Sequence, residues 1–126
     1  MPSDSLGILL LSGTHDRAHY AFVLATGAAS IGRRVVLFAS NAGCRALLAD
    51  WSGLTEAGRD VTVRAAGVAG LDELRDAATA LGIKLIVCEA GLRAEGLTGT
   101  ELYTNVGVAG VVTFLSEVGA GQIVSI

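Results

Sequence analysis

The sequence contains few of the residues that mark several common protein classes. It has two cysteines, one proline and 5% aromatic residues among 126 positions. The cysteines, Cys44 and Cys88, are too few and too far apart for a disulfide framework or a zinc finger, so both are expected to be thiols. The net charge is −3, and neither a basic run nor an interleaved aromatic patch is present, which argues against nucleic acid as a partner.

Long apolar runs are also missing. No run approaches the roughly 18 residues that a membrane-spanning helix needs, so no membrane span is expected. The opening residues, MPSDS, lack the positive charge of a signal peptide, and the apolar segment Leu6–Leu11 is too short for its hydrophobic region. A cytoplasmic location is therefore predicted.

Apolar residues, in contrast, are abundant. Hydrophobic residues make up 52% of the chain and charged residues 17%, with a mean hydropathy of +0.59. This composition and length predict a single domain over residues 1–126. Most of its elements should be buried on both sides, and a partner should cover part of its surface.

Two kinds of apolar segment alternate along the chain. Short runs of Ile, Leu and Val predict buried strands at Leu6–Leu11, Val35–Ala39, Ile83–Cys88 and Gln122–Ile126, with a very short strand at Val106–Val108. Helices are predicted at Asp16–Ile31, around Cys44 (in a first turn), at Leu71–Leu81, at Thr98–Tyr103 from a capping box, and at Val111–Val118, which would also suit a strand. Trp51–Gly70 is interpreted as a variable connection with an extra edge strand at Val61–Ala65. The alternation implies a parallel sheet covered on both faces.

Two loops leave strands at the carboxyl edge of this sheet, where ligands bind in such folds. Ser12–His15 follows the first strand, and Cys88 ends the third long strand, so both loops are expected to face one crevice. At that position Cys88 is either a reactive nucleophile or a buried, inert thiol. Cys44 is interpreted as a structural thiol, with a resolving or relay role as the alternative.

His15 and His19 are four residues apart and share a helix face. They could complete a His/His/Cys metal site with Cys88, although no fourth ligand is apparent. Alternatively, an imidazolium near Cys88 would stabilise its thiolate. The preferred interpretation is that both histidines are solvated. Gly27–Arg34 lacks the Lys-Ser/Thr pair of a P-loop, and no GxGxxG follows the first strand, so no cofactor or metal is predicted.

The chain resembles the DsrE/DsrF-like family over nearly all its length except Trp51–Gly70. SGTHDRAHYAFVLATGAASIGRRVVLFASNAGCRALL is similar to the family's opening, a strand ending in Ser-Gly, an Asp with a basic residue, and an alanine-rich helix ending in Gly. LDELRDAATALGIKLIVCEAGLRAEGL resembles its later helix, Gly, strand, Cys and Gly-Leu pair, here Gly96 and Leu97. VGVAGVVTFLSEVGAGQIVSI resembles the closing helix and strand. The residues of the opening that match are Ser12, Gly13, Asp16, Arg17, Ala25, Gly27 and Gly32.

The nearest subgroup is the one labelled as sulfurtransferase subunits or peroxiredoxin-like proteins. The resemblance implies a three-layer α/β/α fold with a five-stranded, mainly parallel sheet, and a homo-oligomer, often a trimer or hexamer. It also implies a sulfane-sulfur relay whose carrier is the cysteine at the Cys88 position. Two features depart from the family pattern. Glu89–Leu92 replaces a polar, Met-rich loop, and His15 stands where histidine is unusual.

The sequence therefore predicts a sulfur-relay protein, either a persulfide carrier or a sulfurtransferase. Cys88 would take sulfane sulfur from a protein thiol or a small compound and pass it to an acceptor thiol. The supporting residues of the crevice would be Ser12, Gly13, Thr14, His15 and Asp16. The alternative is a non-catalytic interaction or small-ligand-binding subunit in which Cys88 is buried. A thiol peroxidase is the weaker rival, because no Thr-x-x-Cys segment is present.

Overall fold

The apolar runs form the strands of one sheet in the computed structural model, which describes residues 4–126. The strands are β1 (Leu6–Leu10), β2 (Val35–Ala39), β3 (Lys84–Cys88), β4 (Gly107–Ala109) and β5 (Gln122–Ser125). Their order is β4-β3-β2-β1-β5, and every neighbouring pair is parallel. The sheet is therefore entirely parallel, where the sequence predicted a mainly parallel one.

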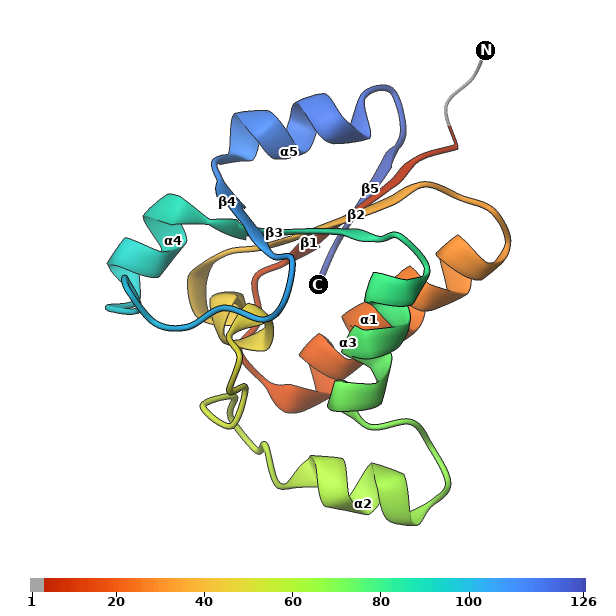
Figure 1. Cartoon of the computed structure of the whole chain (residues 1–126), viewed down its shortest axis with the longest axis vertical. Helices are drawn as coiled ribbons and strands as arrows, with labels where there is room; N and C mark the ends of the chain where they lie inside the picture. Colours follow the sequence, from red (N-terminus) through yellow and green to blue (C-terminus); the bar gives the residue numbers. More distant parts are fainter. Residues whose placement is uncertain (1–3) are drawn as a thin grey trace.

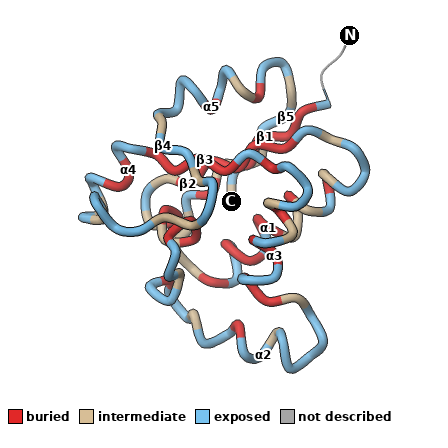
Figure 2. Tube along the Cα trace, in the orientation of Figure 1, coloured by how far each residue is buried: buried red, intermediate tan, exposed pale blue. Residues whose placement is uncertain are grey.

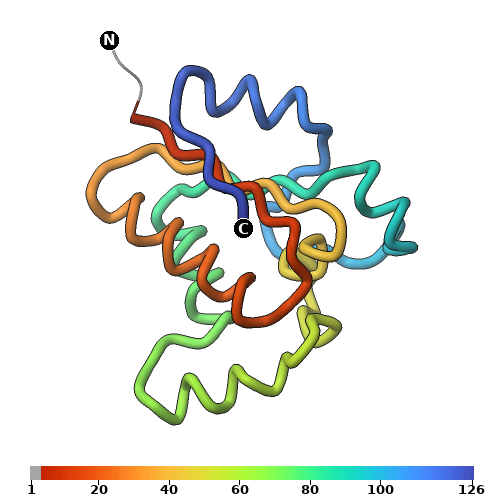
Figure 3. Tube along the Cα trace, turned by 180° about the vertical axis from the view of Figure 1, so that it is seen from behind, coloured from red at the N-terminus to blue at the C-terminus, as the bar shows by residue number. Residues whose placement is uncertain are grey.

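Helices cover both faces of the sheet, which confirms the three-layer prediction. They are α1 (His15–Ser30), the 3₁₀ helix η1 (Asn41–Leu47), α2 (Arg59–Ala65), α3 (Leu71–Ala80), α4 (Glu89–Ala94) and α5 (Val111–Val118). The pair α1 and α3 lies on one face and α5 on the other, while α2 extends beyond α1 and α3 (Figure 1). The reverse view again shows α1 beside α3 (Figure 3).

Each face of the sheet has its own apolar cluster. The larger cluster lies between the sheet and α1 and α3, and it includes Ile8, Leu37 and Phe22. The smaller cluster lies under α5, where the rings of Phe38 and Phe114 stack with centroids 5.0 Å apart. Buried residues concentrate along the strands and the inner sides of α1 and α3 (Figure 2). This double burial explains why the central strands are nearly continuous apolar runs.

Two predicted elements are wrong. The segment Val61–Ala65 was expected as an edge strand but belongs to helix α2, in which only Asp60 is buried. The edges of the sheet are already formed by β4 and β5. The capping-box helix expected at Thr98–Tyr103 is absent. Gly99 has a φ of +84° there, which is incompatible with a helix, and Leu102 instead forms an antiparallel bridge to Leu48.

The segment after β2 lies over the carboxyl ends of the central strands. Cys44 is the fourth residue of η1 and does not lie in its first turn as expected. The end of η1 is held by Arg75 of α3, whose buried guanidinium donates hydrogen bonds to the carbonyl oxygens of Ala46, Leu48 and Ala49. The helix η1 therefore has a defined position beside the strand ends where a site was expected.

Within residues 4–126, no helix is long and apolar enough to cross a membrane. Residues 1–3, which belong to the stretch on which the signal-peptide prediction was based, lie outside the described residues.

Candidate functional site

Cys88 lies where strand β3 ends and helix α4 begins. It is the N-cap residue of α4, and its Sγ accepts a hydrogen bond from the backbone N–H of Gly91 at 3.3 Å. The side chain belongs to the apolar cluster beneath α5, and the residue is 9% exposed. The cysteine is thus buried, mostly surrounded by apolar groups, and its sulfur contacts one backbone donor.

The second cysteine has a different environment. Cys44 has no exposed surface, and its thiol lies 3.8 Å from the carbonyl oxygen of Ala39. Burial, reinforced by negative charge at Cys88 and Glu95, raises the pKa of Cys44 to about 11. A thiol with this pKa is almost fully protonated at neutral pH, and only a thiolate is an effective sulfur nucleophile.

Gly91 brings the surroundings of the two cysteines together. Its N–H contacts the sulfur of Cys88. A Cβ at this position would lie 3.0 Å from the Sγ of Cys44 and 2.8 Å from the Oγ of Ser40. Helix α4 therefore packs closely on η1 because Gly91 has no side chain. Both sulfurs lie next to this glycine.

The loop after β1 also packs against η1. A Cβ on Gly13 would lie 2.6 Å from the Cβ of Ala42, and the hydroxyls of Ser12 and Thr14 are hydrogen-bonded at 3.0 Å. Ser12, Gly13 and Thr14 are only partly exposed. The loop Ser12–His15 and the α4 segment that follows Cys88 thus both contact η1. The helix η1 lies between them, where the sequence predicted a crevice.

His15 is completely buried, so the prediction that both histidines are solvated is wrong. Its Nε2 lies 2.8 Å from Oδ1 of Asp60, and a carboxylate only accepts hydrogen bonds, so Nε2 carries the hydrogen. The imidazole stacks on His19 at 5.6 Å and lies 5.8 Å from the ring of Trp51. These partners belong to α1 and the segment 51–70, whereas Cys88 packs in the cluster under α5.

His19 and Asp16 occupy the two sides of the first turns of α1. His19 is buried, and its Nε2 lies 2.8 Å from the carbonyl oxygen of Ala69. Asp16 is exposed, and hydrogen bonds from the Thr14 hydroxyl and the Arg17 N–H lower its pKa. No group of three or more potential metal ligands is found among residues 4–126.

Asp60 is the polar residue that the sequence interpretation missed. It is 4% exposed and accepts hydrogen bonds from His15, from the N–H of Leu71 at 2.8 Å, and from Arg64 at 3.2 Å. Burial works against ionisation, but these donors outweigh it, so the pKa of Asp60 lies below its ordinary value. Asp60 therefore connects α2 to the starts of α1 and α3. No local pattern identifies it, because its histidine partner is 45 residues away.

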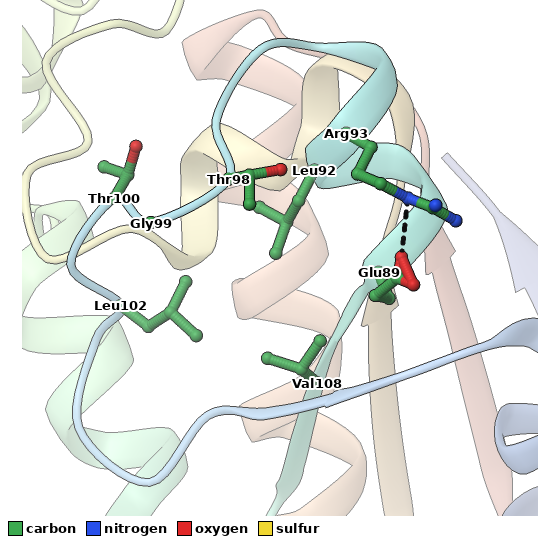
Figure 4. Close-up of a pocket in the computed structure, with 8 residues that line it drawn as sticks. All are labelled: Glu89, Leu92, Arg93, Thr98, Gly99, Thr100, Leu102 and Val108. Carbon is green, nitrogen blue, oxygen red and sulfur yellow. Dashed lines mark ion pairs between the residues drawn. The ribbon is translucent and has the colours of Figure 1, made fainter.

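A pocket of about 390 Å³ lies beside α4 and the edge strand β4 (Figure 4). Its apolar lining consists of Leu92, Leu102 and Val108, whose side chains converge on the hollow. The remaining lining residues are Glu89, Arg93, Thr98, Gly99 and Thr100. Cys88 does not line it. Val108 pairs with Val87, and Cys88 is the next residue of β3. Because successive strand residues face opposite sides of a sheet, the pocket and the Cys88 sulfur lie on different faces.

Comparisons with known proteins agree on the fold. No protein-family model matches the chain, and no curated protein matches its sequence. Among solved structures, the ychN protein from E. coli superposes with a TM-score of 0.66 at 12% identity, covering 98% of this chain and 99% of that one. MTH1491, a protein of unknown function from Methanobacterium thermoautotrophicum, superposes with a TM-score of 0.67 at 17% identity, covering 98% and 100%. The chain thus has a ychN-like fold, in agreement with the DsrE-like fold that its sequence resemblance implies.

Proposed function

We propose that the protein relays sulfane sulfur on Cys88. The observation that carries this proposal is the position of Cys88 at the carboxyl end of β3, with its Sγ hydrogen-bonded to the Gly91 N–H. Strand ends of parallel sheets are where ligands bind, and a backbone N–H stabilises charge on a sulfur that it contacts. The ychN-like fold and the sequence resemblance support the same assignment.

The reaction consists of two thiol-exchange steps. The Cys88 thiolate attacks the outer sulfur of a donor persulfide or thiosulfonate, and the donor leaves as a thiolate or sulfinate. The outer sulfur of the resulting Cys88 persulfide is then attacked by an acceptor thiolate, which regenerates the Cys88 thiolate. Neither step needs a cofactor or a metal, because the oxidation level of the transferred sulfur is conserved.

The high pKa of Cys44 supports Cys88 as the carrier, because the Cys44 thiol is protonated at neutral pH. The small exposed fraction of Cys88, 9%, favours a small sulfane-sulfur compound over a bulky protein as the direct donor. The homo-oligomer and the cytoplasmic location are part of this proposal. Val111, Val112 and Leu115 expose an apolar side of α5, which supports burial against a second copy of the chain.

The test is intact-protein mass spectrometry after incubation with a sulfane-sulfur donor. Wild type and Cys44→Ser should each gain about 32 Da, the mass of one sulfur, and lose it again on reduction. Cys88→Ser should gain nothing. If Cys88→Ser gains the same mass as wild type, Cys88 is not the carrier.

The second candidate is a non-catalytic interaction or small-ligand-binding subunit, and the burial of Cys88 among apolar side chains favours it. Native-state labelling with a thiol reagent separates the two. A Cys88 thiol that reacts only after denaturation supports the second candidate, whereas labelling of the folded protein supports the relay.

A further inference from the structure

The pocket beside α4 has a wall that is held in place before any ligand arrives. Residues 98–102 follow a turn in which the N–H of Leu97 bonds the carbonyl oxygen of Leu92. The end of this wall is fixed to the segment after η1, because Leu102 bridges to Leu48 and the N–H of Tyr103 bonds the carbonyl oxygen of Leu47. A preformed wall lowers the entropy cost of binding.

The charges at the pocket cancel. Glu89 and Arg93 are the charged lining residues, and they form an ion pair of 2.8 Å one helical turn apart on α4. The guanidinium points away from Leu92, Leu102 and Val108 (Figure 4). A charged ligand would thus lose its hydration against apolar side chains without gaining an unpaired opposite charge, which is unfavourable.

The pocket also has two hydroxyls at its solvent-exposed rim, those of Thr98 and Thr100. Within residues 4–126, the hydroxyls of Thr98 and Thr100 make no hydrogen bond to the protein. The Thr98 hydroxyl points toward Leu92, at the margin of the apolar hollow (Figure 4). A ligand with an apolar body in the hollow would have a hydroxyl partner within the same pocket.

We propose that this pocket binds an uncharged small molecule with an apolar ring or chain and one hydrogen-bonding group directed at Thr98. Its volume of about 390 Å³ lies within the range of small-molecule sites. An apolar floor with paired charges and a solvent-exposed hydroxyl at its rim fits such a ligand. This inference does not depend on sulfur chemistry at Cys88, whose side chain lies on the other face of the sheet.

The experiment is a titration of the isotope-labelled protein, followed by backbone amide chemical shifts, with three derivatives of one naphthalene ring. The derivatives are an alcohol, a carboxylate and an amine, so the ring stays constant while the charge changes. The alcohol should give saturable shifts at Leu92, Thr98, Gly99 and Val108. The carboxylate and the amine should bind at least about tenfold more weakly, because each loses hydration without a counter-charge.

Variants locate the binding. Val108→Asp places a charge in the hollow and should weaken binding of the alcohol at least about tenfold. The matched control is Val68→Asp, which makes the same change at an exposed position between α2 and α3, outside the pocket, and should leave the affinity unchanged. Thr98→Val keeps the side-chain shape, removes the hydroxyl, and should weaken binding about threefold to tenfold.

Several outcomes would overturn the proposal. The protein could bind all three derivatives with equal affinity, or the alcohol could give saturable shifts only outside the pocket. The alcohol could also give no saturable shift at millimolar concentration, or Val108→Asp and Thr98→Val could both bind it as tightly as wild type. The probe series and Thr98→Val test the proposal even if Val108→Asp fails to fold. The mass gain expected at Cys88 is independent of all these results.

Discussion

Replacement of Asp60 by alanine should destabilise the protein strongly, although Asp60 lies in a helix whose other side chains are not buried. The carboxylate is 4% exposed and bonded to two buried donors, Nε2 of His15 and the N–H of Leu71. The variant leaves both donors without a partner. Its third donor, Arg64, has a side chain 59% exposed and is expected to become solvated.

The expected loss follows from these partners. A buried donor left without an acceptor costs about 1–3 kcal/mol, so two such donors give about 4 kcal/mol. The exposed Arg64 pair adds little, because solvent screens it. For a domain of 126 residues, this loss corresponds to a melting temperature lowered by roughly 15 °C.

Urea denaturation followed by circular dichroism measures this loss, with Asp16→Ala as the matched control. Asp16 is exposed at the start of α1, where solvent screens its interactions with the helix dipole and its local hydrogen bonds, so its removal should cost much less than the removal of Asp60. The reasoning is refuted if Asp60→Ala and Asp16→Ala lower the unfolding free energy by the same amount.

The stability difference between wild type and Asp60→Ala should also depend on pH. The folded-state pKa of Asp60 lies below the ordinary value of 3.8, since its three donors outweigh burial. Its stabilising contribution is therefore fully present above the unfolded-state pKa and is lost as the pH falls through the folded-state pKa. The difference should be constant from neutral pH to about pH 5 and shrink in the acid range below the ordinary value. A difference that grows on acidification contradicts this assignment.

Three further predictions concern α4, η1 and α3. Iodoacetamide at pH 8 should alkylate Cys44 at least about a hundredfold more slowly in the folded than in the unfolded protein, because folding raises the pKa of the Cys44 thiol from 9.0 to about 11. Equal rates in the two states would refute the burial of Cys44. Gly91→Ala should lower the free energy of unfolding by about 1–3 kcal/mol in urea denaturation, because the new Cβ meets η1. The control Gly27→Ala, in α1, places its Cβ where nothing lies within 4 Å and should be neutral or stabilising. The reverse order of stabilities would contradict the packing of α4 on η1. Arg75→Met should cost about 2–4 kcal/mol by leaving three carbonyl oxygens without their donor, and a calorimetric loss below about 1 kcal/mol would show that they find other partners.

The sheet could be predicted from the sequence because its strands are buried on both faces. A strand buried on both faces is a short continuous apolar run, such as VVLFA in β2. Such a run can be recognised without knowledge of the rest of the chain. The stripe of Leu71, Leu74 and Ala78 predicted α3 for the same reason, since one face of a helix packs on the core. The carboxyl-end position of Cys88 followed directly from the end of such a run.

The surroundings of the site could not be predicted, because they depend on contacts between distant residues. The sequence around His15 predicts a solvated residue at a helix start, but His15 contacts Asp60, 45 positions away. The alternation in Val61–Ala65 suggested a strand, but Val61 is 62% exposed in a helix that buries little. The position of η1 between the two predicted loops likewise depends on the close approach of Gly13 and Gly91 to η1. No periodic pattern in the sequence indicates these contacts.

The place of β5 beside β1 has a consequence for synthesis of the chain on the ribosome. Among the described strands, β1 emerges first, and its neighbours in the sheet are β2 and β5. One backbone edge of β1 is therefore unpaired until residues 122–125 have been made. An unpaired strand edge is a template for association with other chains, so nascent chains are at risk of aggregation throughout translation of the intervening segment. A chaperone that covers β1 during this interval would protect the strand that later lies inside the sheet.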